Sequence, residues 1–208
     1  MAAGDELKSS GITAATPDNI LFGAGTIHKG LKFNPTTKVW NFVESLVGAT
    51  AGGSKLSIVP DVQQVEVDGA LVRVQGLDVK QGETASLETN FAETTPDVIK
   101  AAVIGQVGNS EFAGYEVIES KSSITVDDYW ENVAFVGKTL TGKPIIAILD
   151  NALCTSGMEL EGKNKESAVG KYTFECTQKI TGDHTKLPYH IYYPSVSGAA
   201  VQSEGIEG

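Results

Sequence analysis

The chain has 208 residues, of which 41% are hydrophobic and 20% charged, and its formal net charge is −10 at pH 7. This length and balance are typical of one water-soluble globular domain, and no apolar run approaches the ~20 residues that a membrane-spanning helix needs. The chain has 26 acidic residues against 16 basic ones, and Arg73 is its single arginine. That composition argues against a nucleic-acid reader, because such proteins use clustered lysine and arginine.

The two ends of the chain differ from its middle. Residues 1–17 and 195–208 are small and polar, which predicts a flexible N-terminal arm and a flexible C-terminal tail. The segment Met1–Gly11 has no continuous apolar stretch, so we expect no secretory signal and synthesis in the cytoplasm. No linker divides the middle, so residues 18–194 are predicted to form one domain.

Alternating apolar and polar residues in the first half predict strands with one buried face. Val62–Asp68 and Val72–Gln75 alternate in this way, and Asp68-Gly69 between them favours a tight hairpin turn. The alternation returns in Ala85–Ala92, where Ala85, Leu87, Thr89 and Phe91 share one side.

One segment has the spacing of a helix. Thr95 is a suitable N-cap, Pro96 suits the first helical position, and Asp97 complements the helix dipole. Apolar residues follow at helical spacing, at Ile99, Ala102 and Val103. With Gly105 as the stop signal, the sequence predicts a helix of about ten residues that packs on a sheet.

The second half again favours strands rich in β-branched and aromatic residues. They are expected at Tyr115–Lys121, Tyr129–Gly137, Pro144–Leu153, Gly170–Gln178 and Pro188–Tyr193. Many short strands with one helix predict a mainly β fold, a two-sheet β-sandwich or barrel-like arrangement with one short flanking α-helix.

Residues that could carry chemistry are few. Cys154 and Cys176 are predicted to be reduced strand residues, although a disulfide or a reactive thiol stays open. His28, His184 and His190 lack the spacing of metal ligands and are predicted to be structural or at the surface. We expect no catalytic residue, cofactor or metal, and hence no enzyme.

Two glycine-rich stretches come close to nucleotide-binding motifs. Gly23–Gly30 has its third glycine two places late for a dinucleotide loop, and no helix follows it. Gly137–Pro144 matches a phosphate loop until Pro144, which has no hydroxyl for magnesium, and a strand follows. A hairpin turn is the better interpretation of the second stretch.

Several segments, in order, are similar to a family of virion proteins. Asp18–Ile27 resembles the opening of phage major tail proteins, with its Asn-hydrophobic-Gly-x-Gly segment. Further similar stretches are Val65–Ala70, Val74–Leu77, Ala85–Asn90, Asp128–Ala134, Pro144–Ala152 and Pro188–Pro194. Together they resemble the tail-tube subunit of long, non-contractile, siphovirus-type tails over residues 18–194.

The resemblance implies a structural role. Such subunits have a β-sandwich core with a flanking helix, and they form hexameric rings that stack into a tube around a tape-measure protein. Contractile-tail and secretion-system tubes are implied as fold relatives. Tail terminator and distal tail proteins are the other implied partners, the location is the virion tail, and assembly occurs in the cytoplasm of a bacterial host.

The resemblance also gives the negative charge a function. Acidic side chains facing the bore would repel DNA phosphates, so that DNA passes without specific binding. The candidates for lining the channel are the acids of alternating strands, Glu66, Asp68, Glu88 and Asp150. Acidity as a simple aid to solubility is the other interpretation.

Two segments are candidate assembly arms, and one other class of protein stays open. Residues 1–17 and Ala49–Lys55 are expected to become ordered when rings stack, unless they are a plain tail and a hairpin loop. The alternative is a β-sandwich binding module, immunoglobulin-like or carbohydrate-binding, on a phage or cell surface. Its aromatic patch would draw on Trp40, Trp130, Tyr192 and Tyr193.

Overall fold

The computed structural model describes residues 10–162, 164–165 and 167–194, and most of them belong to strands or to the turns between strands. The helical elements are α1 (Thr16–Asn19), α2 (Pro96–Val103) and a single 3-10 turn at Val126–Asp128. The strands are β1 (Leu21–His28), β2 (Phe33–Asn34), β3 (Val39–Trp40), β4 (Thr50–Gln64), β5 (Asp78–Phe91), β6 (Gly105–Gly108), β7 (Val117–Ser120), β8 (Trp130–Thr139), β9 (Pro144–Cys154), β10 (Gly170–Cys176) and β11 (Tyr189–Tyr192).

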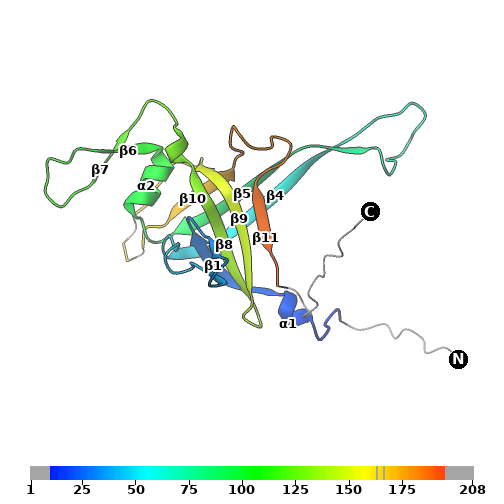
Figure 1. Cartoon of the computed structure of the whole chain (residues 1–208), viewed down its shortest axis with the longest axis horizontal. Coiled ribbons are helices and arrows are strands. Elements are labelled where there is room, and N and C mark those ends of the chain that lie inside the picture. The colour runs from blue at the N-terminus through cyan, green and yellow to red at the C-terminus, as the bar shows by residue number, and fades with distance from the viewer. Residues whose placement is uncertain (1–9, 163, 166, 195–208) are drawn as a thin grey trace.

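Seven strands form one antiparallel sheet in the order β1-β8-β9-β10-β5-β4, and β11 pairs with β9 beside this path. The sheet curls into a half-barrel, so that its edge strands β1 and β4 approach each other. Figure 1 shows the curled sheet with α2 at one side and α1 below it. β2–β3 and β6–β7 are separate two-stranded hairpins.

The main core fills the inside of the curl. The predicted inward side of β5 is confirmed, because Ala85, Leu87, Thr89 and Phe91 are all buried. The strands across the barrel contribute the largest side chains, among them Trp130, Tyr172 and Phe174. α2 closes this interior with three small or branched residues, Val98, Ala101 and Ala102.

The outer face of the sheet is covered only in part. Leu31, Trp40 and Phe42 pack over the outer side of β8 and β9, against Val136 and Ile146 among others. β8 and β9 are therefore buried on both faces, which explains their nearly continuous apolar sequences. The outer side of β4, β5 and β10 carries partly or fully exposed polar residues, including Ser57, Ser86, Glu88, Lys171 and Thr173.

The predicted fold class is confirmed: the chain is mainly β, barrel-like and carries a short flanking helix. One curled sheet supplies both layers of the core. The Thr95 hydroxyl caps α2 by accepting a hydrogen bond from the Val98 amide at 3.4 Å, as expected. The helix ends at Val103, two residues before Gly105, because Ile104 takes the left-handed conformation at φ 48° and Gly105 begins β6.

The predicted first hairpin is wrong in its strands and right in its turn. Val62–Gln64 belong to β4, but residues 65–77 form an irregular tip between β4 and β5, so Val72–Gln75 is not a strand. Gly69 has φ +87° in a turn closed by the Ala70 amide on the Val67 carbonyl. The alternating valines have no second layer to pack against, which removes the main force that makes such a pattern a strand.

Ala49–Lys55 was expected to be a loop or arm, and this is also wrong, because Thr50–Lys55 is the beginning of β4. The strand register shifts between Thr50 and Ser54, where Gly52 and Gly53 both have positive φ. A glycine bulge thus continues the strand where the composition suggested a loop. The expected strands of the second half are all present as β7 to β11.

The flexible ends predicted for residues 1–17 and 195–208 fall largely outside the described residues. Of the first segment, residues 10–17 are described, and α1 begins at Thr16. Residues 1–9 and all of 195–208 lie outside.

Candidate functional site

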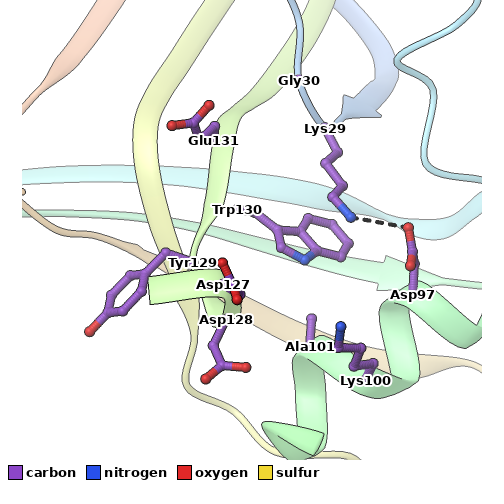
Figure 2. A pocket seen from close by; sticks show the side chains of 10 residues that line it. All are labelled: Lys29, Gly30, Asp97, Lys100, Ala101, Asp127, Asp128, Tyr129, Trp130 and Glu131. Carbon is purple, nitrogen blue, oxygen red and sulfur yellow. Dashed lines mark hydrogen bonds and ion pairs between the residues drawn. The ribbon is translucent and has the colours of Figure 1, made fainter. Parts of the chain in front are cut away.

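A small pocket lies where α2 meets the start of β8, and Figure 2 shows the side chains that line it. Its volume is about 280 Å³. Lys29 reaches across Trp130, with its Nζ 4.5 Å from the ring centroid, and forms an ion pair with Asp97 at 3.0 Å. Trp130 is 6% exposed, so it is a core residue and not a free platform for a ligand. The pocket is lined by residues of α2 and by residues at the end of β1.

The floor of this region is fixed by a shielded ion pair. The Lys121 ammonium donates to both carboxylate oxygens of Asp128, and the Thr125 amide donates to the same carboxylate at 2.7 Å. Burial would raise the pKa of Asp128, but these hydrogen bonds outweigh it and hold the pKa below its usual value. Asp127 and Asp128 lie in the 3-10 turn before β8, where Asp128 is held as an ion-paired carboxylate.

The histidines are structural or exposed, as predicted. His28 is buried, and its ring nitrogens lie 2.8 Å from the Thr26 hydroxyl and 2.9 Å from the Ser45 hydroxyl. Burial lowers the pKa of His28, because the charged ring would lose hydration. His190 is exposed and lies 3.0 Å from Asp150, and His184 is also exposed.

The two cysteines are free and buried. Burial raises the pKa of Cys154, and it raises the pKa of Cys176 to about 12. Neither forms the reactive thiolate at neutral pH.

Other chemistry-bearing arrangements are equally scarce in the described part of the chain. No group of three histidine, cysteine, aspartate or glutamate residues is placed to hold a metal ion there. None of the described helices is long and apolar enough to cross a membrane. The Gly23–Gly30 stretch is part of β1 and its exit, and Gly137–Pro144 is the β8–β9 hairpin.

The four acids proposed to line a channel lie in three places. Glu66 and Asp68 are exposed on the tip between β4 and β5. Glu88 lies on the outer side of β5 between Lys55 at 3.2 Å and Lys171 at 3.4 Å. These contacts, led by the hydrogen bond from Lys55, lower its pKa. Asp150, on β9, faces His190.

The most distinctive surface is the long ribbon made by β4 and β5. Beyond Ser86, β5 loses its partner β10 and pairs with β4 alone, and Figure 1 shows the two strands projecting far from the barrel. Glu83 anchors the base of the ribbon, since it accepts hydrogen bonds from the Leu187 amide and the Tyr189 hydroxyl. At the tip, Leu71 is 97% exposed and Val72 is 73% exposed.

The sequence does not predict these exposed apolar residues, because its alternation places the valines of this segment on a packed strand face. The signal was the adjacent pair Leu71-Val72, which breaks the alternation directly after the Asp-Gly turn. A second exposed apolar group, Phe112 and Tyr115, lies between β6 and β7.

The aromatic residues considered for a binding patch lie in three places. Trp40 and Tyr192 are in contact on the outer face, with ring centroids 5.2 Å apart, and Phe33 lies 5.3 Å from Trp40. Trp130 is inside the barrel, and the hydroxyl of Tyr193 donates to Asn19 beside α1.

Comparison with known proteins gives a similarity to solved structures. No protein-family model matches the chain, and no curated protein matches it either. Among solved structures, the chain is similar to one described as "Tail of empty GTA particle computed with helical refinement, C6 symmetry". The match covers 83% of this chain and 96% of the other, with 9% sequence identity and a TM-score of 0.38.

Proposed function

We propose that the chain is a non-enzymatic structural protein of a phage tail, which polymerises as stacked hexameric rings into the tail tube. The observation that carries this proposal is the β4–β5 ribbon with its uncovered tip. A two-stranded ribbon alone is marginally stable in water, and an exposed strand edge with apolar side chains invites pairing with another chain. A polymer of identical copies would cover both.

Two further features support the proposal. The order of segments over residues 18–194 resembles tail-tube subunits of non-contractile tails. The edge strand β4 keeps an unpaired side in the described part of the chain, and β1 keeps one before Ile27, where residues 45–47 begin to pair with it. Sheets of neighbouring copies can join along these edges. The tape-measure, tail terminator and distal tail proteins are the partners that this role implies.

We further propose that acidic side chains line the channel for DNA. Glu66 and Asp68 form no ion pair within the described residues, so their charges are available to repel phosphates. The charge of Glu88 is offset by its two lysines, and Asp150 is partnered by His190. Most of the repulsion is therefore assigned to the ribbon acids.

Electron microscopy of the purified protein tests the main proposal. Negatively stained samples over a range of concentrations are expected to show rings or hollow tubes. Discrete monomers under every condition would overturn it.

The channel proposal has a separate test in an assembled phage. Glu66→Lys with Asp68→Lys is expected to slow DNA ejection, whereas Glu44→Lys with Asp127→Lys makes the same change of charge away from the ribbon. Equal ejection rates for the two double variants would remove the role of the ribbon acids.

A binding module is the second candidate, favoured by the contacts among Phe33, Trp40 and Tyr192 on the outer face. It predicts a stable monomer that binds glycans. Trp40→Ala would abolish that binding.

A further inference from the structure

The β6–β7 hairpin is an acidic element with no basic residue. Residues 105–120 contain Glu111, Glu116 and Glu119 and neither lysine nor arginine. All three carboxylates are exposed, and none of them forms an ion pair within the described parts of the chain. Figure 1 shows the hairpin extending from the body beside α2.

The same hairpin carries two aromatic rings that nothing covers. Phe112 is 72% exposed and Tyr115 is 74% exposed, and they contact each other edge to face with centroids 6.5 Å apart. Large exposed rings beside charged groups are typical of binding surfaces, because covering them removes apolar area from water.

The β2–β3 hairpin has the opposite charge. Residues 32–40 contain Lys32 and Lys38 and no acid. Both lysines are exposed, and neither lies within ion-pair distance of a described carboxylate. Lys32 acts only at longer range on Glu131, whose pKa is lowered first by its hydrogen bond from Lys179. Apolar area is present here too, since Phe33 and Val39 are exposed.

Within one chain, the two hairpins pack against opposite faces of the sheet. The segment that holds β2 and β3 covers the outer face of β8 and β9. α2 packs into the inside of the same sheet, and the β6–β7 hairpin packs on α2. The sheet therefore lies between the acidic and the basic hairpin.

We propose that the β6–β7 hairpin of one copy docks on the β2–β3 hairpin of a second copy. Three carboxylates then face two ammonium groups, and the rings of Phe112 and Tyr115 cover Phe33 and Val39. This inference rests on the proposed self-assembly and specifies one of its contacts. Because the two surfaces differ, each copy offers one of each, and the contact repeats from copy to copy.

Charge reversal tests the contact with two variants of the full chain. One carries Glu111→Lys, Glu116→Lys and Glu119→Lys, and the other carries Lys32→Glu and Lys38→Glu. Each is expected to self-associate at least about tenfold more weakly in sedimentation experiments, since like charges now face each other. An equimolar mixture should associate again, because every hairpin then meets its opposite on the other variant.

Matched controls reverse charges elsewhere on the surface. Glu159→Lys with Glu175→Lys, and Lys138→Glu with Lys186→Glu, should associate as the wild type does. If a triple reversal impairs folding, as judged by circular dichroism, Phe112→Ser with Tyr115→Ser keeps the charges and should weaken association by a similar factor.

The possible outcomes distinguish a failure of the proposed hairpin contact from a failure of the proposed tube assembly. If the wild type assembles and the reversed variants assemble equally well, the proposed contact is wrong. It is also wrong if mixing the two variants does not restore association. In both cases the tube proposal still stands. A wild type that stays monomeric at every concentration overturns both.

Discussion

Tyr172 has its hydroxyl inside the barrel with no hydrogen-bond partner in the described structure. The Thr94 hydroxyl approaches without reaching hydrogen-bonding geometry, and burial raises the pKa of the phenol. An unsatisfied buried hydroxyl costs about 1–3 kcal/mol. Tyr172→Phe is therefore expected to leave the free energy of unfolding unchanged or raise it by about 1 kcal/mol, measured by urea denaturation.

The control is Tyr172→Ala, which also removes the ring and should lower the free energy of unfolding by about 3–5 kcal/mol. A loss above about 1 kcal/mol in the Tyr172→Phe variant would mean that the hydroxyl has a stabilising partner.

The ion pair between Lys121 and Asp128 makes stability depend on pH. The pKa of Asp128 is lower in the folded chain than its ordinary 3.8, so the pair stabilises the fold above that pH and ceases to do so as pH falls through the folded pKa. Lys121→Met leaves a shielded carboxylate without its partner. We expect a loss of about 3 kcal/mol at pH 7 and a smaller loss near pH 4, where Asp128 can be protonated.

Lys55→Met is the exposed counterpart, because the Lys55 side chain is 69% exposed. It should change the free energy of unfolding by less than about 1 kcal/mol at either pH. Equal effects of the two substitutions would contradict the role assigned to burial.

At the scale of elements, β1 contains two glycines that differ in how much space surrounds them. Both lie in the register shift between Phe22 and Thr26, with φ +91° at Gly23 and +70° at Gly25. A Cβ at Gly23 would meet open space, whereas one at Gly25 would lie 2.4 Å from the Phe135 ring. Gly23→Ala should cost about 1 kcal/mol, and Gly25→Ala about 1–3 kcal/mol more, in thermal or urea unfolding.

Similar losses in the two variants would show that the backbone conformation alone decides, and that the contact with Phe135 adjusts freely. Within the Asn-hydrophobic-Gly-x-Gly segment of the sequence, Gly25 is the position where both the backbone conformation and the available space require glycine.

Elements with one buried face were predicted well from sequence. The alternation in Ala85–Ala92 matches β5, and Thr95-Pro96-Asp97 matches the start of α2. Both signals are local, because period and capping need no knowledge of the rest of the chain. The valines of residues 65–74 failed because a strand pattern becomes a strand only where another layer covers it, and that cover depends on the whole fold.

The surfaces were predicted less well than the elements. Sequence cannot show that Glu88 sits between two lysines from β4 and β10, since these contacts follow from strand order. It also cannot show that Trp130 is buried while Trp40 stays partly exposed on the outer face. The charge of residues 105–120 and 32–40 was visible, but its importance depends on the two hairpins lying on opposite faces.

At the scale of the whole molecule, substitutions at the ribbon tip are expected to affect assembly and not the stability of the monomer. Leu71→Ser with Val72→Ser removes apolar area that is already exposed, so the free energy of unfolding of the monomer should change by less than about 0.5 kcal/mol. Tube growth, followed by light scattering, should slow markedly because the tip has lost its apolar contact. Ile180→Ser, also at a highly exposed site, should leave growth unchanged.

Unchanged growth in the double variant would mean that the tip stays in water in the assembled tube. The ribbon would then need another explanation for its length.

The pairing of β1 with β8 has a consequence for the order of folding. Leu21 pairs with Thr139, whereas β4 and β5 are joined by a single tip and pair over their full lengths. Contacts between distant residues form slowly, because closing a long loop costs more chain entropy. The ribbon can form early during synthesis, but the barrel cannot close until β8, β9 and β10 have emerged from the ribosome. A newly synthesised chain therefore exposes its ribbon before its own core is complete.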